Sequence, residues 1–140
     1  MALADDLNSA AALCANAADA ATTKLIGLGP RPTEPVAAAL WDHKDAILKT
    51  DISVLNNLSS TISAVIISNA LKQLWPQLQG LNDITTSAEA DIAATADISK
   101  AFVKIASIID FGVSVAALAA QPSPSAVQAV ISAVTKMRAS

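Results

Sequence analysis

The chain has 140 residues, a formal net charge of −3 and 53% hydrophobic residues, and 31 of its residues are alanine. A chain of this length can bury a core without a metal ion, and its single cysteine, Cys14, excludes an intramolecular disulfide. The nine basic residues are too scattered for a nucleic-acid interface, and one histidine, two glutamates and no tyrosine leave few catalytic side chains. We therefore predict one non-enzymatic domain over residues 1–140, without a cofactor, a metal ion or a nucleic-acid partner.

The first residues do not form a secretory signal, because Asp5 and Asp6 stand where such a signal carries basic residues. The mature fragment of an exported protein would look the same. The sequence therefore leaves the compartment open.

Glycine and proline gather at residues 27–35, 76–80 and 122–124, and these clusters divide the chain into four segments. In each segment the apolar residues recur at three and four positions, which is the spacing of a helix. We predict an all-α fold, an antiparallel bundle of four helices built around a long central hairpin. A break at Thr50 or Gly80 would give five shorter helices instead.

The first predicted helix carries a seven-residue repeat of apolar positions over residues 3–28. Small side chains in the middle of this repeat predict close packing against a neighbouring helix. Cys14 lies within it and is predicted to be a buried small hydrophobe. The positions of the repeat are Leu3, Leu7, Ala10, Cys14, Ala17, Ala21, Leu25 and Leu28.

The second predicted helix begins at Glu34 and Pro35, with Thr33 as its cap, and continues to Trp75. Thr50 and Asp51 resemble a second cap that would divide it. Its predicted buried side consists of Trp41, Leu48, Ile52, Leu55, Ile62, Ile66 and Leu74.

The third predicted helix begins between Pro76 and Thr86, where Thr86 and Glu89 fit a capping box, and it ends near residue 120. Its predicted inner face consists of Leu81, Ala88, Ile92, Ile98, Phe102, Ile105, Ile109, Val113 and Ala116. An outer polar stripe is predicted from Lys100, Lys104, Ser107, Asp110, Ser114 and Gln121.

The fourth predicted helix runs from about Ser125 to Met137, and Ser123 or Ser125 caps it. Its predicted buried side consists of Val127, Val130, Ile131 and Val134.

The residues that carry chemistry in other proteins have ordinary interpretations here. His43 has no second metal ligand at helical spacing, and two glutamates are too few for a carboxylate-bridged metal pair. Asp110 is predicted to keep a narrow outer face hydrated. The four aromatic residues are predicted to pack in the core or at helix ends, at Trp41, Trp75, Phe102 and Phe111.

If the second and third helices form a hairpin that turns near residues 75–80, the numbers of two residues that face each other add up to about 155. This register pairs Lys72 with Asp83, Asp51 with Lys104, and Lys44 with Asp110. At no height are both helices then free of charge, so the folded hairpin presents no apolar band to lipid. The register predicts a protein that is soluble without detergent and contacts membranes only after the bundle opens.

The exposed helical faces carry few charged pairs, so we expect part of the surface to be covered in the functional state. The sequence predicts a binding module for an apolar ligand, such as a fatty chain, or for a partner protein helix, including a second copy. The alternative is a latent membrane-active bundle that forms pores or coats hydrophobic surfaces. The residues predicted to line the ligand site or the core are Leu55, Ile62, Ile66, Phe102, Ile105 and Ile109.

Overall fold

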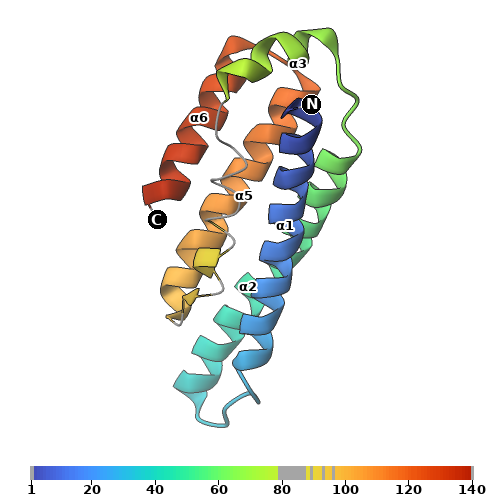
Figure 1. Cartoon of the computed structure of the whole chain (residues 1–140). Helices are drawn as coiled ribbons and strands as arrows, with labels where there is room; N and C mark the ends of the chain where they lie inside the picture. The colour runs from blue at the N-terminus through green and yellow to red at the C-terminus, as the bar shows by residue number, and fades with distance from the viewer. Residues whose placement is uncertain (1, 79–87, 89, 93, 96, 140) are drawn as a thin grey trace.

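The computed structural model describes residues 2–78, 88, 90–92, 94, 95 and 97–139. Within these residues the secondary structure is helical and includes no strand, which confirms the predicted all-α fold (Figure 1). The helices are α1 (Ala2–Gly27), α2 (Pro35–Ser63), α3 (Asn69–Leu74), the 3-10 helix η1 (Trp75–Gln77), α5 (Ile98–Ala120) and α6 (Pro124–Ala139).

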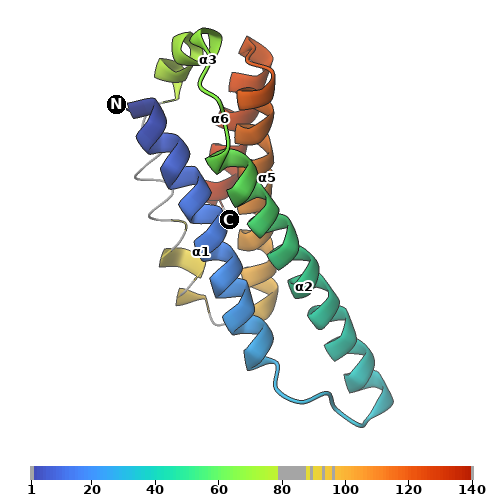
Figure 2. The same ribbon diagram turned by 90° about the vertical axis from the view of Figure 1, so that its right-hand side faces the viewer.

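Helices α1 and α2 form an antiparallel hairpin. Near its turn, the Trp41 Nε1 donates to the Gly29 carbonyl oxygen at 3.2 Å. Toward its open end, the Ser59 Oγ donates to the Ala11 carbonyl oxygen at 2.9 Å. The turn of this hairpin projects beyond the start of α5 in both views (Figure 2).

Helix α1 is also antiparallel to α5. The Lys24 ammonium, near the end of α1, donates to the carbonyl oxygen of Thr95, just before α5 begins. Halfway along both helices, Gly112 of α5 faces Cys14 of α1. Because α2 and α5 are both antiparallel to α1, they are parallel to each other, as Figures 1 and 2 show. Helix α6 returns antiparallel along α5.

The predicted central hairpin is therefore wrong, and so is its register. The antiparallel partner of α5 is α6 on one side and α1 on the other, so the predicted antiparallel register does not apply to α2 and α5. With Leu58 of α2 beside Gly112 of α5, Lys44 and Asp110 lie far apart along the two parallel helices. Asp110 forms an ion pair with Lys136 instead. The third predicted pair involves residue 83, which lies outside the described residues, as do most of 76–97 and the predicted capping box.

Helix α2 ends at Ser63 rather than at Trp75. Val65 and the two isoleucines after it are β-branched and restrict their χ1 angles in a helix, which disfavours its continuation. The Ser68 hydroxyl then starts a new helix, because it accepts a hydrogen bond from the Leu71 amide at 3.2 Å. Thr50 does not interrupt α2, so the alternative of a break at this position is not realised.

The start of α2 is capped by Glu34 and not by the predicted Thr33. The Glu34 carboxylate accepts hydrogen bonds from the amides of Val36 at 3.1 Å and Ala37 at 2.7 Å. Pro35 occupies the first turn as predicted, where its missing N–H leaves no hydrogen bond unmade. At α6 the predicted Ser123 cap is confirmed.

The seven-residue repeat of α1 faces the core, as predicted. Its members from Leu3 to Ala21 are buried, and Cys14 is completely buried. A Cβ atom placed on Gly112 would lie 3.0 Å from both the Cys14 Sγ and the Leu58 Cδ1. Helices α1, α2 and α5 therefore pack closely at this height, and a side chain at position 112 would require Cys14 or Leu58 to shift by a few tenths of an ångström.

The buried face of α5 is rotated from the predicted one. Ile108, Phe111 and Val115 are buried, whereas Val113 is 50% exposed and Ile109 is only partly buried. Ser107, assigned to the polar stripe, is buried as well. Helix α5 has neighbours on two sides and apolar residues all round, so the spacing of its apolar residues did not identify one face.

Helix α6 buries Val127, Val130 and Val134 as predicted, but Ile131 is exposed. Ala133 and Met137 complete its buried side.

Candidate functional surface of the α5–α6 hairpin

The hairpin of α5 and α6 separates charged from uncharged residues along its length. Residues 111–135 contain no aspartate, glutamate, lysine or arginine, and they comprise the second half of α5, the turn and most of α6. The charged side chains of these two helices all lie at the open end: Lys100, Lys104, Asp110, Lys136 and Arg138. The hairpin thus has an uncharged tip and an open end with four basic residues and one acidic residue.

The ion pair between Asp110 and Lys136 marks the border of the uncharged tip. The Lys136 Nζ lies 2.5 Å from the Asp110 Oδ2, and both side chains are at least half exposed. From this pair to the turn, α5 contributes residues 111–120, about 15 Å of helix at the usual rise per residue. The exposed position of Asp110 agrees with the outer location predicted for it.

The outer face of α5 is mostly apolar. From Val103 onward, its exposed positions recur at three and four residues, and Asp110 is the charged member among them. These positions are Val103, Ala106, Asp110, Val113, Ala117 and Ala120. Among the described helices, α5 is long and apolar enough to cross a membrane, although 44% of its most apolar 18-residue stretch is buried in the bundle. Core helices of soluble proteins have the same length and composition.

Two hydroxyl groups in the uncharged tip bond to their own helices. The Ser114 Oγ donates to the Asp110 carbonyl oxygen at 2.8 Å, and the Thr135 Oγ donates to the Ile131 carbonyl oxygen at 3.0 Å. Because these donors are satisfied within one helix, placing them in apolar surroundings costs less than placing free hydroxyls there.

An open hollow of about 460 Å³ lies along the first turns of α5. It is lined by Ser99, Lys100, Val103 and Lys104. Two lysines one turn apart therefore border an exposed valine. The spacing of these residues is visible in the sequence, where both lysines also fit the predicted outer polar stripe of the third helix.

The six predicted lining residues are not gathered around one site. Leu55, Ile62 and Ile105 lie in the core, and Phe102 and Ile109 pack partly buried against it. Ile66 is 88% exposed in the segment between α2 and α3, so its assignment to the lining is wrong. The reason is that α2 ends before Ile66, and the helical periodicity that placed it inside does not extend that far.

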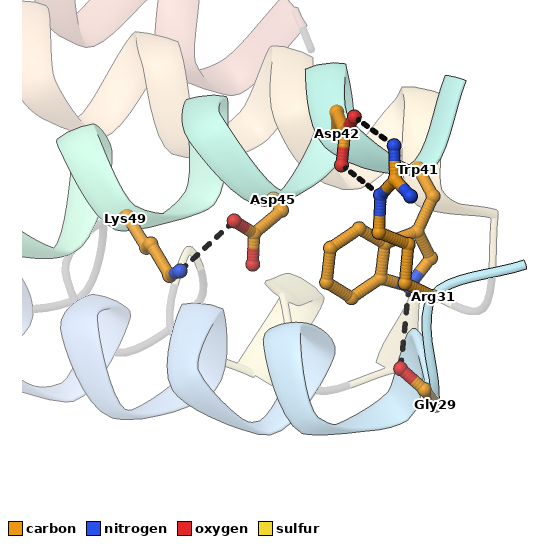
Figure 3. A network of polar contacts seen from close by, with 6 residues as sticks. All are labelled: Gly29, Arg31, Trp41, Asp42, Asp45 and Lys49. Carbon is orange, nitrogen blue, oxygen red and sulfur yellow. Dashed lines mark hydrogen bonds and ion pairs between the residues drawn. The ribbon is translucent and has the colours of Figure 1, made fainter. Parts of the chain in front are cut away.

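The turn of the α1–α2 hairpin holds a network of polar contacts (Figure 3). The Arg31 guanidinium forms two 2.9 Å hydrogen bonds with the Asp42 carboxylate, and this pairing lowers the pKa of Asp42. The Trp41 ring lies beside this pair, with its Nε1 directed at Gly29. The backbone of Gly29 has a φ of +69°, which favours glycine. These charges satisfy one another, so the network fixes the turn.

The other titratable groups form no catalytic arrangement among the described residues. His43 is exposed. Burial raises the pKa of the Cys14 thiol to about 11, which keeps it protonated and unreactive at neutral pH. Within the described part of the chain, no three histidine, cysteine or acidic side chains lie close enough together to hold a metal ion.

The uncharged tip was not recognised in the sequence, although every residue of it is visible there. Pro122 and Pro124 divide the run between two helices, and charge was counted along single helices. Counting charge over two consecutive helices and their turn would have revealed it. No protein-family model matches this chain, and no curated protein and no solved structure is significantly similar to it.

Proposed function

We propose that this protein is a non-enzymatic helical bundle that binds anionic lipid surfaces through its α5–α6 hairpin. The observation that carries the proposal is the uncharged run 111–135, bordered by four basic residues and one acidic residue. Apolar side chains gain free energy on leaving water, by about 25 cal/mol per Å². Basic side chains near an anionic lipid surface contribute about 1 kcal/mol each.

The charge of the other hairpin supports a defined orientation on the lipid. Residues 2–63 contain seven acidic and four basic residues, so the α1–α2 hairpin has a net negative charge. An anionic surface repels this hairpin and attracts the α5–α6 hairpin. The bundle would therefore bind with the side formed by α5 and α6 toward the lipid and with the α1–α2 hairpin on the opposite side.

A second candidate function is the binding of one anionic amphiphile in the hollow on α5. A volume of about 460 Å³ lies within the range of small-molecule sites, about 300–1,000 Å³. Lys100 and Lys104 would bind the anionic head, and Val103 would contact the chain. This proposal keeps the apolar ligand expected from the sequence but places it outside the core, because the close packing at Gly112 leaves little room between α1, α2 and α5.

Co-sedimentation with vesicles tests the first proposal. We expect the protein to bind vesicles that contain phosphatidylserine much better than vesicles of pure phosphatidylcholine, and added salt to weaken the binding. Val113→Glu places a charge on the exposed tip and should weaken binding about tenfold or more. Val36→Glu is the matched control, because Val36 is 67% exposed on α2 at the far end of the bundle.

Equal binding to both vesicle types, or equal losses in the two variants, would contradict the proposal. Binding of a monomeric fatty acid that Lys100→Gln abolishes, without binding to vesicles, would favour the single amphiphile. Concentration-dependent dimerisation without any lipid binding would favour a second copy as the partner.

A further inference from the structure

We propose that the α5–α6 hairpin inserts as one unit into a single lipid leaflet, as far as the Asp110–Lys136 pair, and that α5 separates from α1 when it does so. This inference rests on the proposed lipid binding. It adds how deeply the hairpin inserts and which helices separate during insertion.

The length of the uncharged tip fits one leaflet. The hydrocarbon core of a bilayer is about 30 Å thick, so one leaflet contributes about 15 Å. Residues 111–120 of α5 span about the same length. At this depth the paired Asp110 and Lys136 side chains lie at the headgroups, and the remaining basic residues of the hairpin lie further out.

Three backbone amides at the turn of the tip are bonded within the hairpin. The Gln121 amide donates to the Ala117 carbonyl oxygen at 2.9 Å, and the Val127 amide donates to the Ser123 carbonyl oxygen at 3.1 Å. The Ser123 Oγ also accepts from the Ala126 amide at 3.1 Å. Lipid penalises unpaired backbone groups, so these bonds reduce the cost of placing the turn in hydrocarbon.

The buried side of the hairpin is the reason for the opening step. Phe111, Val115, Leu118, Val127 and Val130 are completely buried in the bundle, while the exposed residues of the tip are small apolar ones on α5 and mostly polar but uncharged ones on α6. Insertion of the closed bundle would place these small or polar side chains in lipid and leave the large apolar ones in the bundle. Separation of α5 from α1 moves the large side chains from one apolar environment to another, so their burial is retained.

The native cysteine offers a direct test of this separation. A Cβ on residue 112 lies 3.0 Å from the Cys14 Sγ, and an S–S bond places each Cβ about 3 Å from the partner sulfur. Refolded with oxidised and reduced glutathione, Gly112→Cys should therefore form a disulfide that ties α5 to α1, and an added reductant should release it. The other close atom, Leu58 Cδ1, is the end of a flexible side chain and can move aside. Gly112→Ala has the same Cβ without the sulfur and is the matched control.

The two phenylalanines provide the readout without any added label site. In protein labelled with fluorophenylalanine, each ring gives a fluorine resonance. Phe111 lies just inside the proposed insertion limit at Asp110, and Phe102 lies two helical turns outside it. Lipid with a nitroxide on its acyl chain broadens nearby fluorine resonances. With reduced Gly112→Cys, with Gly112→Ala and with the unaltered protein, we expect strong broadening of Phe111 and weak broadening of Phe102. With oxidised Gly112→Cys, we expect Phe111 to stay sharp.

The outcomes separate this inference from the proposed function. Equal broadening of Phe111 in the oxidised and reduced forms would overturn the separation of α5 from α1. Vesicle binding by the unaltered protein without broadening of Phe111 would overturn insertion and leave surface binding in place. If the unaltered protein does not bind anionic vesicles at all, the proposed function fails, and this inference fails with it.

Discussion

The two hairpins of this bundle are stabilised in different ways. The turn of the α1–α2 hairpin is fixed by polar contacts, through Glu34 at the helix start and the Arg31–Asp42 pair beside it. The α5–α6 hairpin has the Asp110–Lys136 ion pair toward its open end and an uncharged tip. One hairpin is acidic and suited to water, and the other combines apolar faces with basic ends. Under the proposed function, solubility and lipid affinity reside in different halves of one small fold.

The largest expected effect concerns the rotated face of α5. Ile108→Ala should lower the free energy of unfolding by about 2–5 kcal/mol, because Ile108 is buried and its removal leaves a cavity. Ile109→Ala should cost distinctly less, since Ile109 is only partly buried. Urea unfolding of the two variants measures the difference. Equal losses would mean that α5 does not present the face described here.

The contact between the two hairpins should make the free energy of unfolding fall at alkaline pH. Burial raises the pKa of Cys14 from 9.0 to about 11, so its contribution to stability is present below pH 9 and is lost as the pH rises toward 11. A shift of this size corresponds to about 2–3 kcal/mol when fully lost. Cys14→Ala should remove this part of the pH dependence in urea unfolding experiments.

The reactivity of Cys14 with a thiol reagent gives an independent control for the alkaline experiment. Labelling should be slow in the native protein and fast in denaturant. Fast native labelling at neutral pH would show that the contact between α1 and α5 opens readily without lipid.

The smallest expected effect concerns the turn of the α1–α2 hairpin. The amides of Ala37 and Val36 lower the pKa of Glu34, so the cap is stabilising above the ordinary pKa of a glutamate and is lost as the pH falls through the lowered value. Glu34→Gln should reduce the acid sensitivity of the thermal midpoint. Circular dichroism melts between pH 7 and pH 2 measure it. Unchanged acid sensitivity would mean that other carboxylates dominate.

Local signals in the sequence predicted the local features of the fold. The repeat of α1, the burial of Cys14, Pro35 in the first turn of α2 and the Ser123 cap were all predicted, because each depends on neighbours within one or two turns. The end of α2 was not, because residues 63–68 contain neither glycine nor proline. A run of β-branched residues and a capping serine mark the end of this helix, and they are a weaker sequence signal than glycine or proline.

Features that depend on tertiary structure were not predicted. The parallel arrangement of α2 and α5 depends on how the chain returns between them, and nothing in the helical spacing specifies this. The face of α5 was not defined because Ile108, Ile109, Phe111 and Val113 are all apolar and follow one another closely. The candidate surface was missed for a related reason, since it belongs to a pair of helices and not to one.

The contact between Cys14 and Gly112 also has a consequence for the order of folding. About 100 residues of chain separate these two positions, whereas the α1–α2 and α5–α6 hairpins each close over a short turn. Short loops close at a lower entropic cost than long ones, so each hairpin can form before the two meet. During synthesis, the face of α1 that receives α5 has no partner until residue 112 has left the ribosome. The alanines on that face leave only a small apolar surface exposed to other chains during this interval.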